Sequence, residues 1–167
     1  MSVADHRQGR FRRWISKAGS AIVALAPAIG VGTLLAPHAA GDPAPAVEQA
    51  VMAARGAASC GPLNYNPTVE HAADIVNRST YTFLDHSAEN VPADEAHPTA
   101  IVKDLGIKTS KVSSLQGAAH NEGDAIKGVL LEGRNVIPDC SYTDFGVSLL
   151  YEPRSDFRLA VVVLVGT

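Results

Sequence analysis

The stretch that decides the fold lies near the end of the chain and reads Leu159-Ala160-Val161-Val162-Val163-Leu164-Val165. Its side chains are all apolar, with no alternation between apolar and polar positions. A strand of this kind is covered on both faces, because a strand with one solvated face alternates. We therefore expect this stretch at the centre of a sheet with helices on both sides.

The segments around this stretch supply the rest of a layered fold. Phe145 to Glu152 predicts a second strand, and Pro153 to Asp156 predicts the turn that joins it to a strand over Phe157 to Val165. The fold class that we expect is α+β: a three-layer α-β-α sandwich with a mainly antiparallel sheet and a C-terminal β-hairpin.

Helices are predicted upstream of the hairpin from apolar spacing and from start and stop residues. They are expected over Pro43–Ala58, from Asn66-Pro67 onward, from His97-Pro98 to Gly106, and from Gly123-Asp124 to Gly133. Ile126, Val129 and Leu130 are expected on the buried face of the last helix. Asp85 to His97 reads as a polar loop, and Ile107 to Gln116 gives no clear pattern.

The helix that follows Asn66-Pro67 has the clearest start, because Asn66 can cap it and Pro67 suits its first turn. Its buried face is expected to carry Val69, Ala72, Ala73, Val76 and Thr80. The sequon Asn77-Arg78-Ser79 falls inside this helix, so we do not expect it to be glycosylated.

Residues 1–41 have the pattern of a signal peptide. Five basic residues between Arg7 and Lys17 precede an uncharged run over 18–36, and small residues follow at Ala39-Ala40-Gly41. Cleavage there would leave a mature chain beginning near Asp42 in the cell envelope or outside the cell. The alternative is an uncleaved anchor over 18–36, because the run is close to the length that spans a bilayer.

The expected mature chain, residues 42–167, is acidic and has the length of one domain. Of 14 Lys and Arg and 17 Asp and Glu in the whole chain, five basic and one acidic residue fall in 1–41, which leaves a net charge of −7 for the rest. This balance argues against nucleic acid as a partner and against electrostatic docking on a membrane. The only contact with a membrane that we expect is through residues 18–36, if they are not removed.

The two cysteines, Cys60 and Cys140, are expected to form a disulfide bond, since exported proteins fold where thiols are oxidised. Two free thiols are the alternative. No nucleophile elbow and no phosphate-binding loop is present, and the four histidines after residue 41 lack metal-ligand spacing.

Several short motifs resemble the cysteine-rich secretory, antigen 5 and pathogenesis-related (CAP) superfamily. They are the opening Cys60 to Pro67, the stretch Phe83-Leu84-Asp85-His86-Ser87, the helix Ala125 to Glu132, and Ser141-Tyr142-Thr143 leading into Phe145-Gly146-Val147. The resemblance covers residues 60–167 and implies an α-β-α sandwich.

The resemblance also implies a cleft in which two His and two Glu can hold a divalent metal. Here His86 and Glu132 stand at two of these positions, Ser141 replaces the second His, and Gln116 lies at the start of the segment that replaces the second Glu. One imidazole and one carboxylate make a poor metal site. We therefore expect these four residues to line a ligand cleft, with no metal, no cofactor and no catalytic residue.

The leading hypothesis is an exported, non-catalytic CAP-like domain that binds an apolar ligand, such as a lipid, or a protein partner. A secreted hydrolase that uses His86 with Glu132 or Glu122 is one alternative. A structural protein tethered by residues 18–36 is another.

Overall fold

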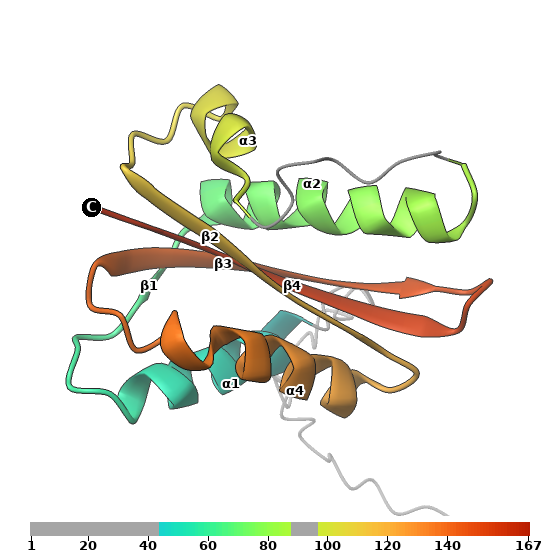
Figure 1. Ribbon diagram of the computed structural model, residues 1–167, viewed down its shortest axis with the longest axis horizontal. Coiled ribbons are helices and arrows are strands. Elements are labelled where there is room, and N and C mark those ends of the chain that lie inside the picture. Colours follow the sequence, from blue (N-terminus) through green and yellow to red (C-terminus); the bar gives the residue numbers. More distant parts are fainter. Residues whose placement is uncertain (1–43, 88–96) are drawn as a thin grey trace, which may run out of the picture. The chain divides into compact units, whose positions relative to one another are not determined.

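The computed structural model describes residues 44–87 and 97–167 (Figure 1). The predicted signal peptide, its cleavage site and most of the predicted loop Asp85–His97 lie outside these residues. The elements are α1 (Ala44–Gly56), β1 (Asn64–Tyr65), α2 (Pro67–Leu84), α3 (Thr99–Asp104), β2 (Lys111–Ala119), α4 (Glu122–Glu132), a 3₁₀ turn (Gly133–Asn135), β3 (Tyr142–Glu152) and β4 (Phe157–Gly166).

The strands form one sheet in the order β1-β3-β4-β2. β4 pairs antiparallel with β3 and with β2, whereas the short β1 runs parallel to β3. Helices α2 and α3 lie on one side of the sheet and α1 and α4 on the other (Figure 1). The three-layer α-β-α sandwich with a mainly antiparallel sheet and a C-terminal hairpin is confirmed.

β4 supplies side chains to both hydrophobic cores. Ala160, Val162 and Leu164 pack in the core beneath α1 and α4, and Val161, Val163 and Val165 pack in the core beneath α2 and α3. This division follows from the two-residue period of a strand. The expectation of a strand covered on both faces is therefore confirmed.

Two glycines allow helices to approach the sheet closely. A Cβ at Gly146 of β3 would lie 2.0 Å from the backbone nitrogen of Glu70 in α2. A Cβ at Gly117 of β2 would lie 2.0 Å from the carbonyl oxygen of Ala125 in α4. Each helix therefore rests against bare main chain.

The expected helices are confirmed. The starts of helix α4 and of strand β3 differ from the prediction. The side chain of Asn121 caps α4 by accepting from Asp124 N, so α4 begins at Glu122 rather than at Gly123-Asp124. Val129 of α4 is fully buried, whereas Ile126 and Leu130 are only partly buried at the edge of the core. β3 begins at Tyr142 rather than at Phe145, because its first residues pair with the end of β4 across a bulge.

β2 occupies most of the segment that the sequence left without an assignment. It is an edge strand, and its polar Ser113 and Ser114 are buried because β4 holds the strand between the two helical layers. Tertiary pairing, not local pattern, makes this segment a strand. Within the described residues, none of the helices has the length and apolar character needed to cross a membrane.

Shortening a β4 side chain should show how strongly the fold depends on this strand. Leu164 is fully buried, so Leu164→Ala should lower the free energy of unfolding by about 2–5 kcal/mol in urea denaturation. The same substitution at Leu131, which is 67% exposed, should change it by less than about 0.5 kcal/mol. Equal losses at the two positions would contradict the role given to β4.

Candidate functional site

The structure separates two of the four predicted cleft residues by the whole length of the sheet. Ser141 directly precedes β3, whereas His86 follows α2 near the other end of β3, where Arg154 of the β3–β4 turn donates to the Asp85 carbonyl at 2.8 Å. β3 has 11 residues, which at roughly 3.3 Å each span about 35 Å. Ser141 and His86 therefore do not share a cleft.

The other two, Gln116 and Glu132, meet at the edge of the sheet. The Glu132 carboxylate, at the end of α4, accepts the backbone N–H of Gln116. β2 has no strand beyond it, so this contact satisfies an outward-facing amide of the edge strand. The Gln116 side chain lies on the α2 side of the sheet, because its partner Val161 belongs to the core beneath α2.

The metal site that the family resemblance implied does not fit this arrangement. His86 follows α2 on one side of the sheet, and Glu132 ends α4 on the other. Over residues 44–87 and 97–167, no three His, Cys, Asp or Glu side chains gather closely enough to hold a metal ion.

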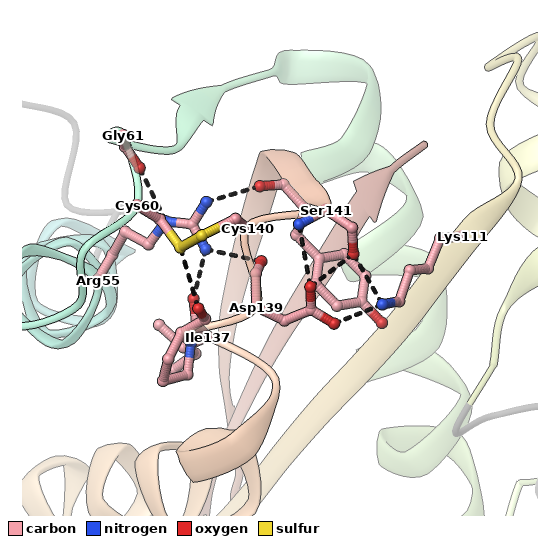
Figure 2. The surroundings of a disulfide bond; sticks show 10 residues. Arg55, Cys60, Gly61, Lys111, Ile137, Asp139, Cys140 and Ser141 are labelled. Carbon is pink, nitrogen blue, oxygen red and sulfur yellow. Dashed lines mark hydrogen bonds and ion pairs between the residues drawn. A yellow bond between two sulfur atoms is a disulfide. The ribbon is translucent and has the colours of Figure 1, made fainter.

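Ser141 belongs to a polar cluster with Lys111 and Asp139 (Figure 2). Lys111 Nζ bonds the Asp139 carboxylate and donates to Ser141 Oγ at 2.7 Å, and Ser141 Oγ donates to Asp139 Oδ1 at 2.7 Å. The hydrogen bond to Asp139 raises the pKa of Lys111. The protonated lysine therefore donates to both Asp139 and Ser141.

Arg55 of α1 organises the loops beside this cluster (Figure 2). Its side chain is only 3% exposed. Its guanidinium donates to the carbonyl oxygens of Gly61, Ile137, Asp139 and Tyr142, at 2.6 to 2.8 Å. One buried cation thus joins the segment after α1 to the segment before β3.

The predicted disulfide between Cys60 and Cys140 is confirmed, and it ties the same two segments together (Figure 2). The Cα atoms are 5.2 Å apart and the cysteines are 80 residues apart in sequence. Closing a loop of this length contributes about 4.5 kcal/mol in the chain-entropy account. The disulfide therefore stabilises the fold around Ser141 against unfolding.

Glu152, at the end of β3, is a fully buried carboxylate that the sequence did not single out. Burial raises its pKa, but hydrogen bonds from Ser155 and from the backbone of Arg154 outweigh burial, so the pKa of Glu152 is lowered. The ionised carboxylate holds the backbone amides of the β3–β4 turn. Its carboxylate therefore caps this turn.

A pocket of about 130 Å³ lies between α2 and the sheet. Asn77 and Thr80 of α2 form one wall, and β2 and β4 form the rest through Gln116, Gly117, Ala118, Leu159, Ala160 and Val161. Gln116 is thus the one predicted cleft residue that lines it. None of these lining residues carries a charge.

Asn77 gives this pocket a fixed polar group. The side chain is fully buried, and its Nδ2 donates to the Leu159 carbonyl oxygen at 2.8 Å and to Ser148 Oγ at 3.1 Å. A carbonyl oxygen can only accept, so the amide cannot flip without losing this bond. Asn77 Oδ1 is left buried without a hydrogen-bond partner.

The sequence carries a signal for Asn77, although the residue belongs to no catalytic motif. Asn77 falls four residues after Ala73 and eight after Val69, on the face that the spacing assigns to the core. A polar residue at a core position needs a partner, which marks it for attention. Its position as the first residue of a sequon drew attention only to glycosylation, which its burial excludes.

Several solved structures share this fold. A cysteine-rich secretory protein of Staphylococcus aureus gives a TM-score of 0.54, covering 73% of this chain and 38% of its own, at 11% identity. An extracellular SCP-domain protein of Bacillus anthracis gives 0.55, covering 74% of this chain and 40% of its own, at 12% identity. An outer surface protein of Borrelia burgdorferi gives 0.58, covering 73% of this chain and 90% of its own, at 9% identity.

These similarities concern the fold. The chain has the fold of the SCP, or CAP, domain, as the motif resemblance implied. It spans about two fifths of the length of the first two proteins, 38% and 40%. No protein-family model matches the sequence, and no curated protein matches it.

Removing the Arg55 guanidinium should destabilise the fold strongly. Arg55→Met keeps much of the apolar stem but leaves four carbonyl oxygens without their donor, and hydrogen bonds to charged groups contribute about 1.5–3 kcal/mol each. A loss of at least about 3 kcal/mol is expected in urea unfolding. Arg134→Met is the matched control, since Arg134 is exposed and, among the described residues, donates to the Leu131 carbonyl. A similar loss in this variant would refute the role given to Arg55.

The Lys111–Asp139 pair should contribute stability over a wide pH range. Hydrogen bonds from Lys111 and Ser141 hold the pKa of Asp139 far below the ordinary 3.8, so its contribution is present above 3.8 and is lost as pH falls below it. The raised pKa of Lys111 makes its contribution present below 10.5 and lost as pH rises through the folded value.

A double-mutant cycle with Lys111→Met and Asp139→Asn measures this coupling through urea unfolding. The coupling should be constant between about pH 5 and pH 9 and should shrink progressively below about pH 3.8. A coupling that is unchanged at about pH 2 would contradict the assignment.

Proposed function

We propose that this chain is an exported, non-catalytic domain that binds a ligand in the cell envelope or outside the cell. Three observations support the location. Residues 1–41 have the pattern of a signal peptide, and the Cys60–Cys140 disulfide suits an oxidising compartment. The proteins with similar folds are described as secretory, extracellular or outer-surface proteins.

The non-catalytic part of the proposal rests on the hydrogen bonds that the polar and charged side chains make within the fold. Lys111, Asp139 and Ser141 neutralise and bond one another, and Glu152 caps a turn. The alternative, a hydrolase, needs His86 within hydrogen-bond reach of Glu132 or Glu122. His86 follows α2 on one side of the sheet, whereas both glutamates belong to α4 on the other side, which argues against that alternative.

The observation that carries the binding function is the pocket beneath α2. It combines apolar residues of β4 with the polar residues Asn77, Thr80 and Gln116. Ligand sites typically have this composition, with apolar walls and a few polar groups. A small apolar molecule or part of a lipid fits this description.

Expression of the full chain in an exporting bacterium tests the proposal. The protein should be recovered from the medium or the envelope with an N-terminus near Asp42. Native mass spectrometry should show a bound mass that organic extraction removes. His86→Asn is the control, and it should retain the same bound mass.

Two results would contradict this function. A chain that still begins at residue 1 or 2 in the membrane fraction would favour the tethered alternative. A protein that is free of ligand, and that captures nothing from a total lipid and metabolite extract, would count against binding.

A further inference from the structure

A second pocket lies on the other side of the sheet, between the last residues of β3, the first residues of β4 and the start of α4. We propose that it binds a small zwitterion with an apolar side chain, such as an amino acid, whose carboxylate pairs with Arg158 and whose ammonium pairs with Glu122. This inference goes beyond the proposed function, because it concerns a different site and does not depend on binding beneath α2.

The strand order places Arg158 between the two sides of this pocket. Arg158 of β4 lies opposite Tyr151 of β3 and Ala119 of β2. Its side chain projects to the side of α1 and α4, as does that of Ala160 two residues later. The guanidinium carbon lies 3.9 Å from the centroid of the Tyr151 ring, and this stacking holds the positive charge over the sheet. Glu122, the first residue of α4, lines the same pocket from the edge next to β2.

Two opposite charges therefore line this pocket without neutralising each other. Within residues 44–87 and 97–167, neither the Arg158 guanidinium nor the Glu122 carboxylate forms an ion pair. Stacking on Tyr151 uses the charge of the guanidinium but none of its N–H donors. The planar fork of these donors matches a carboxylate, which can accept two of them at once. The Glu122 carboxylate can accept from an ammonium group.

The other charges near the pocket favour a ligand with no net charge. His120 lines the pocket, and its Nδ1 lies 3.9 Å from the Asp156 carboxylate. An anion alone would approach Arg158 but would also meet the negative charges of Glu122 and Asp156. A cation alone would approach Glu122 but would meet the positive charge of Arg158. Like charges at such distances repel, so a zwitterion pairs with both groups where a single ion pairs with one.

The volume and the apolar surface of the pocket indicate the size of the ligand. A volume of 280 Å³ is the space of about nine water molecules at their share of liquid volume. Leu149, which is buried, gives the pocket an apolar surface. An amino acid with a branched apolar side chain, such as leucine, has this size and composition.

Three probes of similar shape separate the two charges. L-Leucine carries both charges, 4-methylpentanoate lacks the ammonium, and 3-methylbutylamine lacks the carboxylate. In ¹H–¹⁵N NMR titrations of the purified exported chain at neutral pH, leucine should shift the backbone amides of His120, Glu122 and Arg158. Each probe with a single charge should bind at least about fivefold more weakly, because one hydrogen bond between charged groups is lost.

Two variants assign the two charges to their residues. Glu122→Gln should weaken leucine at least about fivefold but should not weaken 4-methylpentanoate, which has no ammonium to place there. Arg158→Gln should weaken both leucine and 4-methylpentanoate but not 3-methylbutylamine. Arg134→Gln and Asp104→Asn are the matched controls, because both residues are exposed and neither lines the pocket. The controls should leave all three titrations unchanged, and the spectra without ligand report whether each variant folds.

The outcomes bear on this inference separately from the proposed function, which is tested by the mass that co-purifies with the exported chain. Equal binding of the three probes, no shift with leucine, or shifts confined to residues outside this pocket would overturn the inference. An equal loss of leucine binding in Arg134→Gln and Arg158→Gln would overturn it as well. Selective binding of leucine that is lost in Glu122→Gln and in Arg158→Gln, but kept in both controls, supports it.

Discussion

β4 must be buried on both of its faces, and most of the architecture follows from this requirement. Its residues from Leu159 to Val165 are at most 4% exposed. A strand in such a position needs hydrogen-bond partners at both edges, which β3 and β2 provide, and apolar cover on both sides, which the four helices provide. The approach of α2 to Gly146 and of α4 to Gly117 follows from the same demand for close cover.

Burial of β4 does not hold the irregular segments in place. A second set of interactions, made by polar side chains and the disulfide, does so. Arg55 bonds four carbonyl oxygens from both sides of the Cys60–Cys140 disulfide, and Lys111 joins the same region to the edge strand through Asp139. Polar residues that would draw attention as reactive groups are therefore part of the framework. Ser141 is the clearest example, since it accepts from Lys111 at 2.7 Å and donates to Asp139 at 2.7 Å.

The two sides of the sheet differ in how their polar groups are paired, and this difference bears on function. On the side of α1 and α4, the Glu132 carboxylate covers an amide of the edge strand. On the side of α2, Asn77 replaces an apolar residue in the core and leaves one acceptor without a partner. A polar group at such a position lowers stability unless something binds it. Ser114 Oγ, on the same side of the sheet, is likewise buried without a partner among the described residues.

The sequence by itself determined the layered fold, because Leu159–Val165 can be satisfied only at a sheet centre and because Asn66-Pro67 and Gly133 mark helix ends locally. It also indicated the disulfide, since two cysteines in a chain that carries the pattern of a signal peptide leave one pairing. Only the tertiary structure decided that Lys111–Ala119 is a strand, that His86 and Ser141 lie at opposite ends of the sheet, and that Asn77 rather than either of them faces a pocket. The physical reason is that local spacing fixes the face of an element on which a residue lies. Which faces meet, and which polar atoms remain unpaired, depends on contacts between residues distant in sequence, such as Asn77 with Leu159 and Gln116 with Glu132.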